Sequence, residues 1–297
     1  MKPLISFITI NYNSTKYTLD LLKSIEEHTS LNYEIIIIDN NSTQEQIDHL
    51  EQKYSSYKYT TLIKNPINCG FACANNIASK KAQGEYLFFI NNDTKLLNDA
   101  TLYFYNFIQK EKNCALLTAQ LIDENKEFAS SYKLFPSLTK ELLGNTLARA
   151  FNKYPSNKIH LTEPTKVEVI TGACMFFKQD VFNELQGLDE QFFLYCEEED
   201  VSKRVRKLGY EIYFLPESHI FHKGGGSAEQ SYDLLKEYYI SYNYLIFKHF
   251  NKIQASILYT LMSLKIFRRS LRKKHYKKLL ALAIKGFDET QSLRHKQ

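Results

Sequence analysis

An apolar run that ends in a polar turn opens the chain: Leu4-Ile5-Ser6-Phe7-Ile8-Thr9-Ile10, followed by Asn11-Tyr12-Asn13-Ser14. The run has the length and composition of a β-strand. The next segment, residues 17–27, carries leucine and isoleucine at helical spacing and is predicted to form a helix. A strand, a polar turn and a helix therefore make up the first structural unit.

The same alternation continues to about residue 90. Further strands are predicted over residues 33–38, 59–63 and 85–90, and further helices up to about Tyr54 and over residues 71–81. Strands and helices that alternate at this spacing predict a mostly parallel sheet with helices on its faces. The strands that end near Ile10, Ile38 and Ile90 are continuous in Ile, Leu and Phe, as expected of strands that are buried on both sides.

Polar residues follow each of the three most apolar strands. The turns are Asn11 to Ser14, Asp39 to Ser42 and Asn91 to Thr94. Because ligands of open α/β sheets bind beyond the carboxyl ends of the strands, we expect these turns to line one crevice. The alternative is that the residues only cap helices and form turns. Three such turns together favour a binding site.

The crevice has the residue types of a nucleotide site. The first turn holds no GxGxxG motif and the sequence holds no GxxxxGK[ST], which excludes dinucleotide and P-loop sites. Asp39 can accept a hydrogen bond from a pyrimidine imide or a ribose hydroxyl, and Asp93 can coordinate a divalent cation that neutralises a diphosphate. A metal and side chains are therefore expected to hold the phosphates.

A second unusual stretch is Phe192-Phe193-Leu194-Tyr195-Cys196-Glu197-Glu198-Glu199-Asp200, in which four acids follow an aromatic and apolar run. Adjacent carboxylates raise one another's pKa unless cations, a metal or backbone donors compensate. One explanation is the acidic first turn of a helix, which complements the helix dipole. The other is a site that uses the carboxylates chemically.

Composition and charge describe a globular protein with a basic tail. The chain has 297 residues, 44% of them hydrophobic, and a net charge of +5. Residues 231–297 hold 14 Lys and Arg against 4 Asp and Glu, so the rest of the chain is acidic overall. Five cysteines without a CxxC pair indicate a reducing compartment, and residues 1–6 do not resemble a signal peptide. We expect a cytoplasmic protein.

The tail is predicted to be helical and aromatic, with Ile253, Ile257, Leu261 and Leu264 at helical spacing and a run of Lys and Arg after them. Residues 253–266 are too few to span a bilayer. A basic amphipathic helix suits the anionic inner face of the cytoplasmic membrane. A solvated basic helix and nucleic-acid binding are the alternatives, and the sequence carries no nucleic-acid module. The aromatic tail also leaves homodimerisation open.

Six motifs in order resemble the family 2 glycosyltransferases, and within them the rhamnosyltransferase-like members. They are residues 8–13, 38–42, 68–76, 91–94, 171–175 and 192–204. The resemblance runs over roughly residues 4–250. It implies the GT-A fold, an α/β nucleotide-binding sheet fused to an acceptor-binding half, and transfer of a sugar from a nucleotide donor with inversion at the anomeric carbon.

The resemblance also implies which residues bind the donor. The positions that match are Thr9, Asn11, Tyr12, Asp39, Asn41, Asn68, Asn92 and Asp93. Asp93 matches a residue that holds a divalent cation, Mg²⁺ or Mn²⁺. His222, in His222-Lys223-Gly224-Gly225-Gly226-Ser227, matches a histidine that helps to hold the metal or the diphosphate; the alternative is an ordinary surface histidine after a strand. Family members usually carry a second acid where this chain has Asn91, and a neutral amide is a weaker ligand for hard cations. The glycines after His222 would let the backbone pass close to a ligand.

Glu198 falls at the position that resembles the family's general base, where members usually have Asp. The same resemblance makes Glu197 an acceptor contact or a helix-start acid. A spacing of four residues predicts an ion pair between Asp200 and Arg204, and Glu199 is expected to face solvent. Residues 167–177 are expected to form one strand under the acceptor site, and Gly172 in this strand is expected to leave room for the acceptor.

These expectations combine into a domain plan and a function. Residues 1–230 are predicted to form the GT-A domain, with a nucleotide-sugar half at 1–122, an acceptor half at 123–230 and loops over 123–166; residues 231–297 form the helical tail. The predicted reaction is inverting transfer of a sugar, with rhamnose a candidate, from a nucleotide-diphosphate donor to a surface-polysaccharide or lipid-linked acceptor. The alternative is a catalytically silent sugar-nucleotide-binding relative.

Overall fold

The computed structural model describes residues 2–152, 154–156, 160–224 and 231–296. Its strands are β1 (Ile5–Asn11), β2 (Tyr33–Asp39), β3 (Thr60–Lys64), β4 (Tyr86–Ile90), β5 (Thr94–Leu96), β6 (Cys114–Ile122), β7 (Phe128–Ala129), β8 (Tyr132–Lys133), β9 (Thr165–Lys166), β10 (Val169–Ile170), β11 (Cys174–Lys178) and β12 (Glu211–His222). Its α-helices are α1 (Thr15–His28), α2 (Gln44–Tyr54), α3 (Phe71–Ser79), α4 (Ala100–Lys110), α5 (Leu138–Asn152), α6 (Gln179–Glu184), α7 (Glu197–Lys207), α8 (Tyr232–His249), α9 (Lys252–Ser270) and α10 (Lys274–Lys285). Two short 3₁₀ turns, η1 (Glu289–Gln291) and η2 (Leu293–Lys296), follow.

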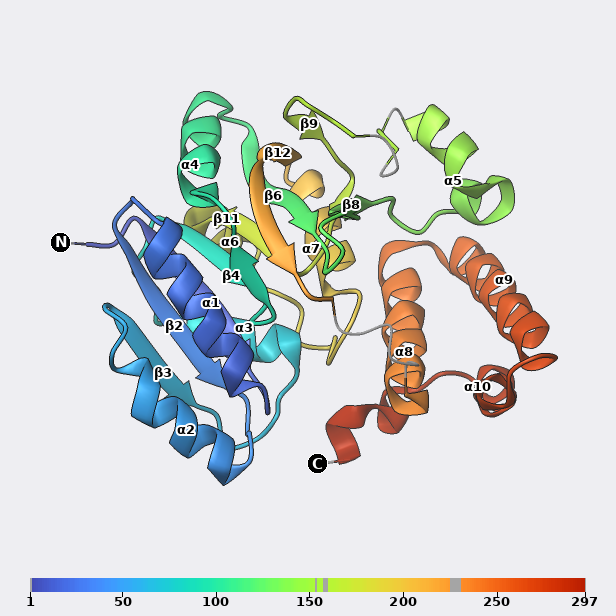
Figure 1. Ribbon diagram of the computed structural model, residues 1–297. Helices are drawn as coiled ribbons and strands as arrows, with labels where there is room; N and C mark the ends of the chain where they lie inside the picture. The colour runs from blue at the N-terminus through green and yellow to red at the C-terminus, as the bar shows by residue number, and fades with distance from the viewer. Residues whose placement is uncertain (1, 153, 157–159, 225–230, 297) are drawn as a thin grey trace.

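A large sheet crosses the molecule in the order β3-β2-β1-β4-β11-β6-β12-β5 (Figure 1). Strands β3, β2, β1 and β4 are parallel, as the alternation of strands and helices predicts. The other half is mixed, because β11 runs antiparallel to β4 and β6 while β6 and β12 are parallel. The four parallel strands therefore end at the same edge of the sheet.

Helices cover both faces of this sheet. On one face, Phe7 of β1 shares a buried cluster with Leu21 of α1 and Phe104 of α4. On the other face, Ile8 packs in a second cluster with Val201 of α7. Neighbouring residues of a strand point to opposite faces, so an uninterrupted apolar strand can supply both cores. Burial of these side chains is the main stabilising contribution to the fold.

Two sequence-based expectations for the acceptor half are wrong. Residues 167–177 do not form one strand, because β10 pairs with β8 in a separate two-stranded sheet and β11 pairs with β4. Both pieces are apolar and buried, so they look like one strand on either side of the short break at Thr171-Gly172-Ala173. The region 123–166 is not only loops, since it contains α5, whose periodicity is interrupted by Gly144 at φ 80° and ψ 170°.

The C-terminal helices α8, α9 and α10 pack beside the acceptor half (Figure 1). They share a third buried cluster with Phe135, with Val169 of β10 and with Phe192 and Cys196 before α7. The helical C-terminal region predicted from the sequence is therefore present. The division of the chain at residue 230 stays a prediction.

A close backbone contact joins the start of α3 to the segment before α7. Phe71 N donates to Phe193 O over 2.8 Å. Gly70 has φ 87°, and a Cβ at this position would lie 2.4 Å from Phe193 O. Only glycine combines this backbone conformation with this approach. The contact holds residues 192–196 against the first half of the sheet.

Replacing Gly70 with alanine should separate the two segments. We expect Gly70→Ala to lower the free energy of unfolding by about 1–2 kcal/mol for the left-handed backbone and by roughly another 1–3 kcal/mol for the clash. Gly209→Ala is the matched control, because Gly209 has φ 88° and a Cβ added there would meet no heavy atom within 4 Å. Urea unfolding measures both variants. Equal losses in the two would show that the Phe193 contact contributes nothing.

Candidate active site

The three polar turns meet at the carboxyl ends of the parallel strands. Asn11 Nδ2 donates to Asp39 Oδ2 over 2.7 Å, which joins the first turn to the second. Asn92 Nδ2 donates to Ser14 Oγ over 2.6 Å and to Thr18 Oγ1 over 2.9 Å, which joins the third turn to the first. The turns thus line one region, as their positions after the strands predict.

Two adjoining hollows open over these turns. The larger, about 380 Å³, is lined by Ile10, Tyr12, Asn40, Asn68, Gly70, Phe71, Phe193, Leu194, Leu234 and Leu293. The smaller, about 220 Å³, is lined by Ile10, Tyr12, Ser14, Phe71, Asn75, Ile90, Asn91 and Asn92. Tyr12 lines both hollows and half of its surface is exposed. Together the hollows form the candidate donor crevice.

The predicted donor residues divide into two groups. Tyr12, Asn68 and Asn92 line the hollows. Asp39 and Asn11 lie buried behind them, and Asp39 Oδ1 also accepts a hydrogen bond from Ser42 N over 2.9 Å. These two residues shape the turns in this structure.

Three predicted donor residues line neither hollow and do not lie in the Asn11 and Asp39 pair. Asp93 lies beside His222, 3.5 Å away, and the other two are Thr9 and Asn41. The Thr9 side chain is buried, and its Oγ1 has no hydrogen-bond partner among the described residues. Asn41 is exposed at φ 70° and does not line either hollow. Nucleotide contacts of both residues stay predictions.

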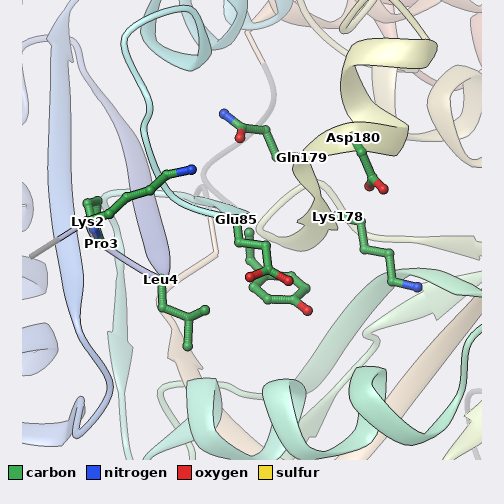
Figure 2. A pocket seen from close by; sticks show the side chains of 8 residues that line it. Lys2, Pro3, Leu4, Glu85, Lys178, Gln179 and Asp180 are labelled. Carbon is green, nitrogen blue, oxygen red and sulfur yellow. The ribbon is translucent and has the colours of Figure 1, made fainter.

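A further hollow of about 480 Å³ lies at the opposite edge of the sheet. Figure 2 shows its lining residues at the start of β1 and β4 and near the β11–α6 junction: Lys2, Pro3, Leu4, Glu85, Tyr86, Lys178, Gln179 and Asp180. It lies at the amino ends of β1 and β4, whereas the polar turns lie at their carboxyl ends. It is therefore separate from the donor crevice.

The pairing of β5 with β12 brings the two predicted metal ligands together. His222 stands opposite Thr94 in the antiparallel register, next to Asp93. His222 Nε2 lies 3.5 Å from Asp93 Oδ1, and each side chain is 20% exposed. In the described part of the chain, no three His, Cys, Asp or Glu side chains gather around a common metal position. Gly225, Gly226 and Ser227 lie outside the described residues.

Asp93 and His222 fit a hard divalent cation that a nucleotide helps to bind. Mg²⁺ is usually held by one or two protein carboxylates together with substrate phosphates and water, so a complete protein cage is not required. Asp93 supplies a carboxylate and His222 a ring nitrogen, both accessible from the solvent. A second acid is absent at Asn91, as the sequence shows.

The four acids form the first turn of α7, so the explanation as a helix start describes their backbone. Tyr195 and Cys196, just before it, have φ values of 74° and 69°. Left-handed conformations of residues with a side chain are strained and concentrate at functional sites. The strained pair turns the chain so that Glu197, Glu199 and Asp200 are buried.

Lys133 of β8 forms ion pairs with two of these acids. Its Nζ lies 2.8 Å from Glu198 Oε1 and 2.6 Å from Glu199 Oε1. The expectation that Glu199 faces solvent is wrong, because Lys133 holds it in the interior and only 7% of its surface is exposed. Sequence reasoning missed Lys133, which lies in a segment with weak periodicity and carries no motif.

The three glutamates bind protons differently because their surroundings differ. Burial and neighbouring charges raise the pKa of Glu197 well above its usual value, and they raise the pKa of Glu199 to about 7. Burial also acts on Glu198, but the charge and hydrogen bond of Lys133 outweigh it and lower the pKa. Glu198 is therefore the carboxylate of the three that stays ionised at neutral pH, and an ionised carboxylate can accept a proton.

Glu198 also contacts the loop between β10 and β11. A Cβ on Gly172 would lie 3.8 Å from Glu198 Cδ, so the glycine places no side chain against the carboxylate, and the Glu198 side chain is 14% exposed. The next residue of the loop, Ala173, accepts a hydrogen bond from Asn91 N over 3.1 Å. The loop thus links the acid cluster to the turn that carries Asn92 and Asp93.

The family model of glycosyl transferase family 2 matches residues 6–186, which include the parallel half of the sheet and all three polar turns. The chain belongs to glycosyl transferase family 2. The rhamnosyltransferase WbbL of Escherichia coli is 24% identical over 230 residues, which cover 74% of this chain and 83% of the relative. An N-acetylglucosaminyl-diphospho-decaprenol L-rhamnosyltransferase of Mycobacterium tuberculosis is 20% identical over 94% of this chain and 98% of its own length.

Both of these relatives of the family 2 glycosyltransferase are named rhamnosyltransferases. Among solved structures, GalNAc-T7 with UDP, GalNAc and Mn²⁺ superposes with a TM-score of 0.61 at 17% identity, over 81% of this chain and 47% of the other. The likeness shows the GT-A fold. The protein is a glycosyltransferase with this fold, as the resemblance implied.

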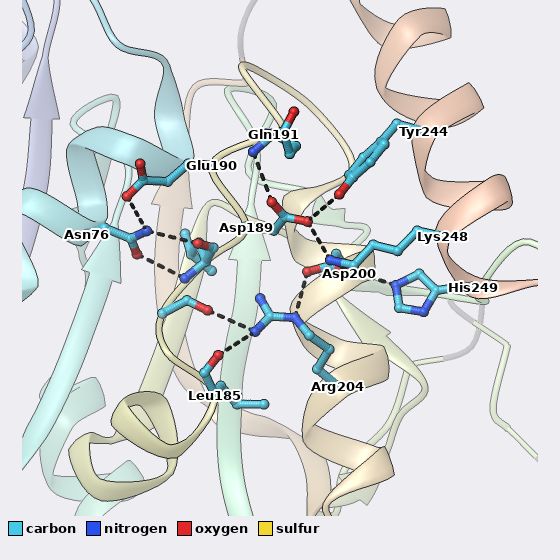
Figure 3. A network of polar contacts seen from close by, with 12 residues as sticks. Asn76, Leu185, Asp189, Glu190, Gln191, Asp200, Arg204, Tyr244, Lys248 and His249 are labelled. Carbon is cyan, nitrogen blue, oxygen red and sulfur yellow. Dashed lines mark hydrogen bonds and ion pairs between the residues drawn. The ribbon is translucent and has the colours of Figure 1, made fainter. Parts of the chain in front are cut away.

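A buried network anchors α8 of this family 2 glycosyltransferase to α7 (Figure 3). Asp200 accepts a hydrogen bond from Arg204 Nε over 2.7 Å, which is the ion pair predicted from their spacing. Its other oxygen lies 2.5 Å from Lys248 Nζ and 2.8 Å from His249 Nε2. Lys248 also pairs with Asp189. The last turn of α8 therefore closes over the Asp200 carboxylate.

Loss of the Asp200 charge should destabilise the enzyme. We expect Asp200→Asn to lower the free energy of unfolding by about 3–5 kcal/mol, because buried cations would lose their partner. Burial alone would raise the pKa of Asp200, but His249, Arg204 and Lys248 lower it from 3.8 to about 2. The stabilisation is thus complete above about pH 4 and decreases as the pH falls towards 2. Urea unfolding at several pH values measures it.

The matched control is Asp20→Asn, because Asp20 pairs with Lys95 at the surface, where both side chains are about 40% exposed (39% and 44%). An exposed pair contributes under about 1 kcal/mol. If the two variants lose the same stability, or if the loss in Asp200→Asn does not diminish in acid, the network does not anchor α8 as described.

Proposed function

We propose that this enzyme transfers a sugar, with rhamnose the first candidate, from a nucleotide-diphosphate donor to a cell-envelope glycan, and that it inverts the anomeric centre. The observation that carries the proposal is the position of Glu198. It is an ionised carboxylate that lies beside Gly172 with 14% of its side chain exposed, and the Gly172 loop is hydrogen-bonded to the turn of the donor crevice. A proton acceptor thus stands next to a nucleotide-type site.

The donor crevice suits a nucleotide. The half-exposed ring of Tyr12 and the ring of Phe71 offer apolar surface to a base, and Asn68 and Asn92 offer hydrogen bonds to polar groups. The solved relative GalNAc-T7 holds UDP, and both rhamnosyltransferase relatives are named for the sugar they transfer. These names support a nucleotide donor and rhamnose.

Asp93 and His222 would hold a divalent cation, Mg²⁺ or Mn²⁺, beside the crevice. When bound, the cation would neutralise charge on the donor diphosphate. GalNAc-T7, which shares the fold, was solved with Mn²⁺. Both side chains are partly exposed, which is consistent with a cation that arrives together with the nucleotide.

Glu198 would act as the general base of the transfer. Its carboxylate takes the proton of an acceptor hydroxyl while the hydroxyl oxygen forms a bond to the anomeric carbon. The bond from that carbon to the diphosphate breaks on the opposite side, and the diphosphate leaves with the bonding electrons. Inversion of the anomeric centre follows. Lys133 keeps Glu198 ionised, so the base is ready at neutral pH.

The acceptor proposed is a surface-polysaccharide or lipid-linked glycan at the cytoplasmic side of the membrane. The support is the name of the mycobacterial relative, whose acceptor carries a diphospho-decaprenol lipid. The Gly172 side of Glu198 is where an acceptor hydroxyl would reach the carboxylate.

The first test is a transfer assay with Glu198→Gln. We expect kcat to fall about 10²–10⁴-fold, because the amide cannot take the proton. The Kd for the nucleotide product should stay within about twofold of wild type, which shows an intact crevice. Glu199→Gln is the matched control, one residue away on the same helix turn, and should lose less than about tenfold. Unchanged turnover in Glu198→Gln would remove Glu198 from the mechanism.

The second test addresses Lys133. Lys133→Met removes the charge that keeps Glu198 ionised among Glu197 and Glu199, so the pKa of Glu198 should rise. The acid limb of the pH profile of kcat/KM should therefore move to higher pH, with activity recovered at alkaline pH.

Lys133→Arg keeps the charge and should keep the acid limb within about half a unit of wild type. A Met variant that is slow at every pH without a shift of the limb would assign Lys133 a purely structural role.

A further inference from the structure

Helix α9 is apolar on two opposite faces. Ala255, Leu258, Met262 and Ile266 are buried against the neighbouring helices. A second row, which we call the α9 stripe, consists of Ile253, Ile257, Leu264, Phe267 and Leu271 at and just beyond the helix, and all five are exposed. Ile253 is 75% and Leu271 70% exposed.

The spacing of the α9 stripe places its members on one side of the helix. Successive members are separated by 4, 7, 3 and 4 residues, which is the repeat of a single helical face. Three of the four residues from which the sequence predicts an apolar face belong to this outward row. Most of this predicted apolar face therefore does not pack into the protein core. Contiguous exposed apolar rows mark surfaces that contact a partner or a membrane.

The adjacent helix α5 exposes apolar side chains as well. Leu142, Leu143 and Leu147 are 62%, 50% and 49% exposed. Helices α5 and α9 lie side by side (Figure 1), and Lys265 of α9 pairs with Glu141 of α5. Two neighbouring helices thus expose large apolar residues on the same part of the molecule.

The segment that carries the α9 stripe has charges of one sign. Residues 252–287 contain ten Lys and Arg and no Asp or Glu. Arg268 and Arg272 are exposed and are i,i+4 neighbours, and each follows directly after a member of the stripe. An apolar row bordered by cations complements a surface that offers hydrocarbon below anionic headgroups. The same charge opposes pairing with a second copy of this chain, because like charges would meet across a twofold axis.

We propose that α9 lies along an anionic bilayer, with the α9 stripe in the headgroup and acyl boundary and Arg268 and Arg272 on the headgroups. No described helix is long and apolar enough to cross a membrane, so the contact is peripheral. The proposal deepens the proposed function, on which it rests for the membrane as the source of the acceptor. Binding to vesicles needs no donor or acceptor, so each proposal can fail without the other.

The experiment is flotation of the full-length protein with vesicles. We expect wild type to bind vesicles of phosphatidylcholine and phosphatidylglycerol (3:1) at least about tenfold more tightly than pure phosphatidylcholine, because several cations contribute. The triple variant Ile257→Ser, Leu264→Ser and Phe267→Ser should bind the anionic vesicles at least about tenfold more weakly.

Two further variants separate the apolar and the charged contributions. Arg268→Gln with Arg272→Gln should weaken binding about tenfold or more on anionic vesicles and leave the weak binding to neutral vesicles unchanged. The matched control, Ile67→Ser, Leu102→Ser and Tyr103→Ser, changes exposed apolar residues away from α9 and should bind as wild type. Glu198→Gln should also bind as wild type, whatever its transfer activity.

Three outcomes would overturn the proposal. One is equal binding of wild type and the α9 triple variant to anionic vesicles. Another is wild-type binding that does not distinguish anionic from neutral lipid. The third is a wild-type dimer in sedimentation equilibrium that the triple variant converts to a monomer, since a second copy of the chain would then cover the stripe. Circular dichroism and thermal unfolding confirm that each variant is folded.

Discussion

The buried carboxylates at the start of α7 are the groups on which much of the packing in this structure depends. Carboxylates can be buried only if cations or hydrogen-bond donors accompany them. Here the partners come from distant parts of the chain: Lys133 from β8 pairs with Glu198 and Glu199, and Lys248 and His249 from α8 contact Asp200. Strand β8 and the C-terminal helices are thereby held on the same helix turn.

The donor crevice is connected to this turn by two backbone contacts. Phe193 O accepts a hydrogen bond from the start of α3, which borders the larger hollow, and Ala173 O accepts one from the turn before Asp93. Parallel pairing of β1, β2 and β4 fixes where the polar turns lie. The relative position of the donor crevice and Glu198 therefore depends on backbone geometry, which changes less than surface side chains do.

Local patterns predicted part of this arrangement and could not predict the rest. The apolar runs of β1, β2 and β4 and the polar turns after them gave the parallel half of the sheet and the crevice, and the four-residue spacing gave the Asp200 and Arg204 pair. The position of Glu199 depends on Lys133, which is distant in sequence. The break between β10 and β11 was hidden because both pieces are buried. For α9, periodicity identifies an apolar row but does not indicate whether that row packs into the protein core or faces outward.

The Asp200 network also limits how this chain can be recombined with its relatives. Glu198 and Asp200 are two residues apart on one helix turn, yet the partners of Asp200 lie at the end of α8. A chimera that joined the sheet of this protein to the C-terminal helices of another would have to bring matching partners of Asp200 to the positions of Lys248 and His249. The boundary suited to such an exchange thus lies beyond His249 and not at the start of α8.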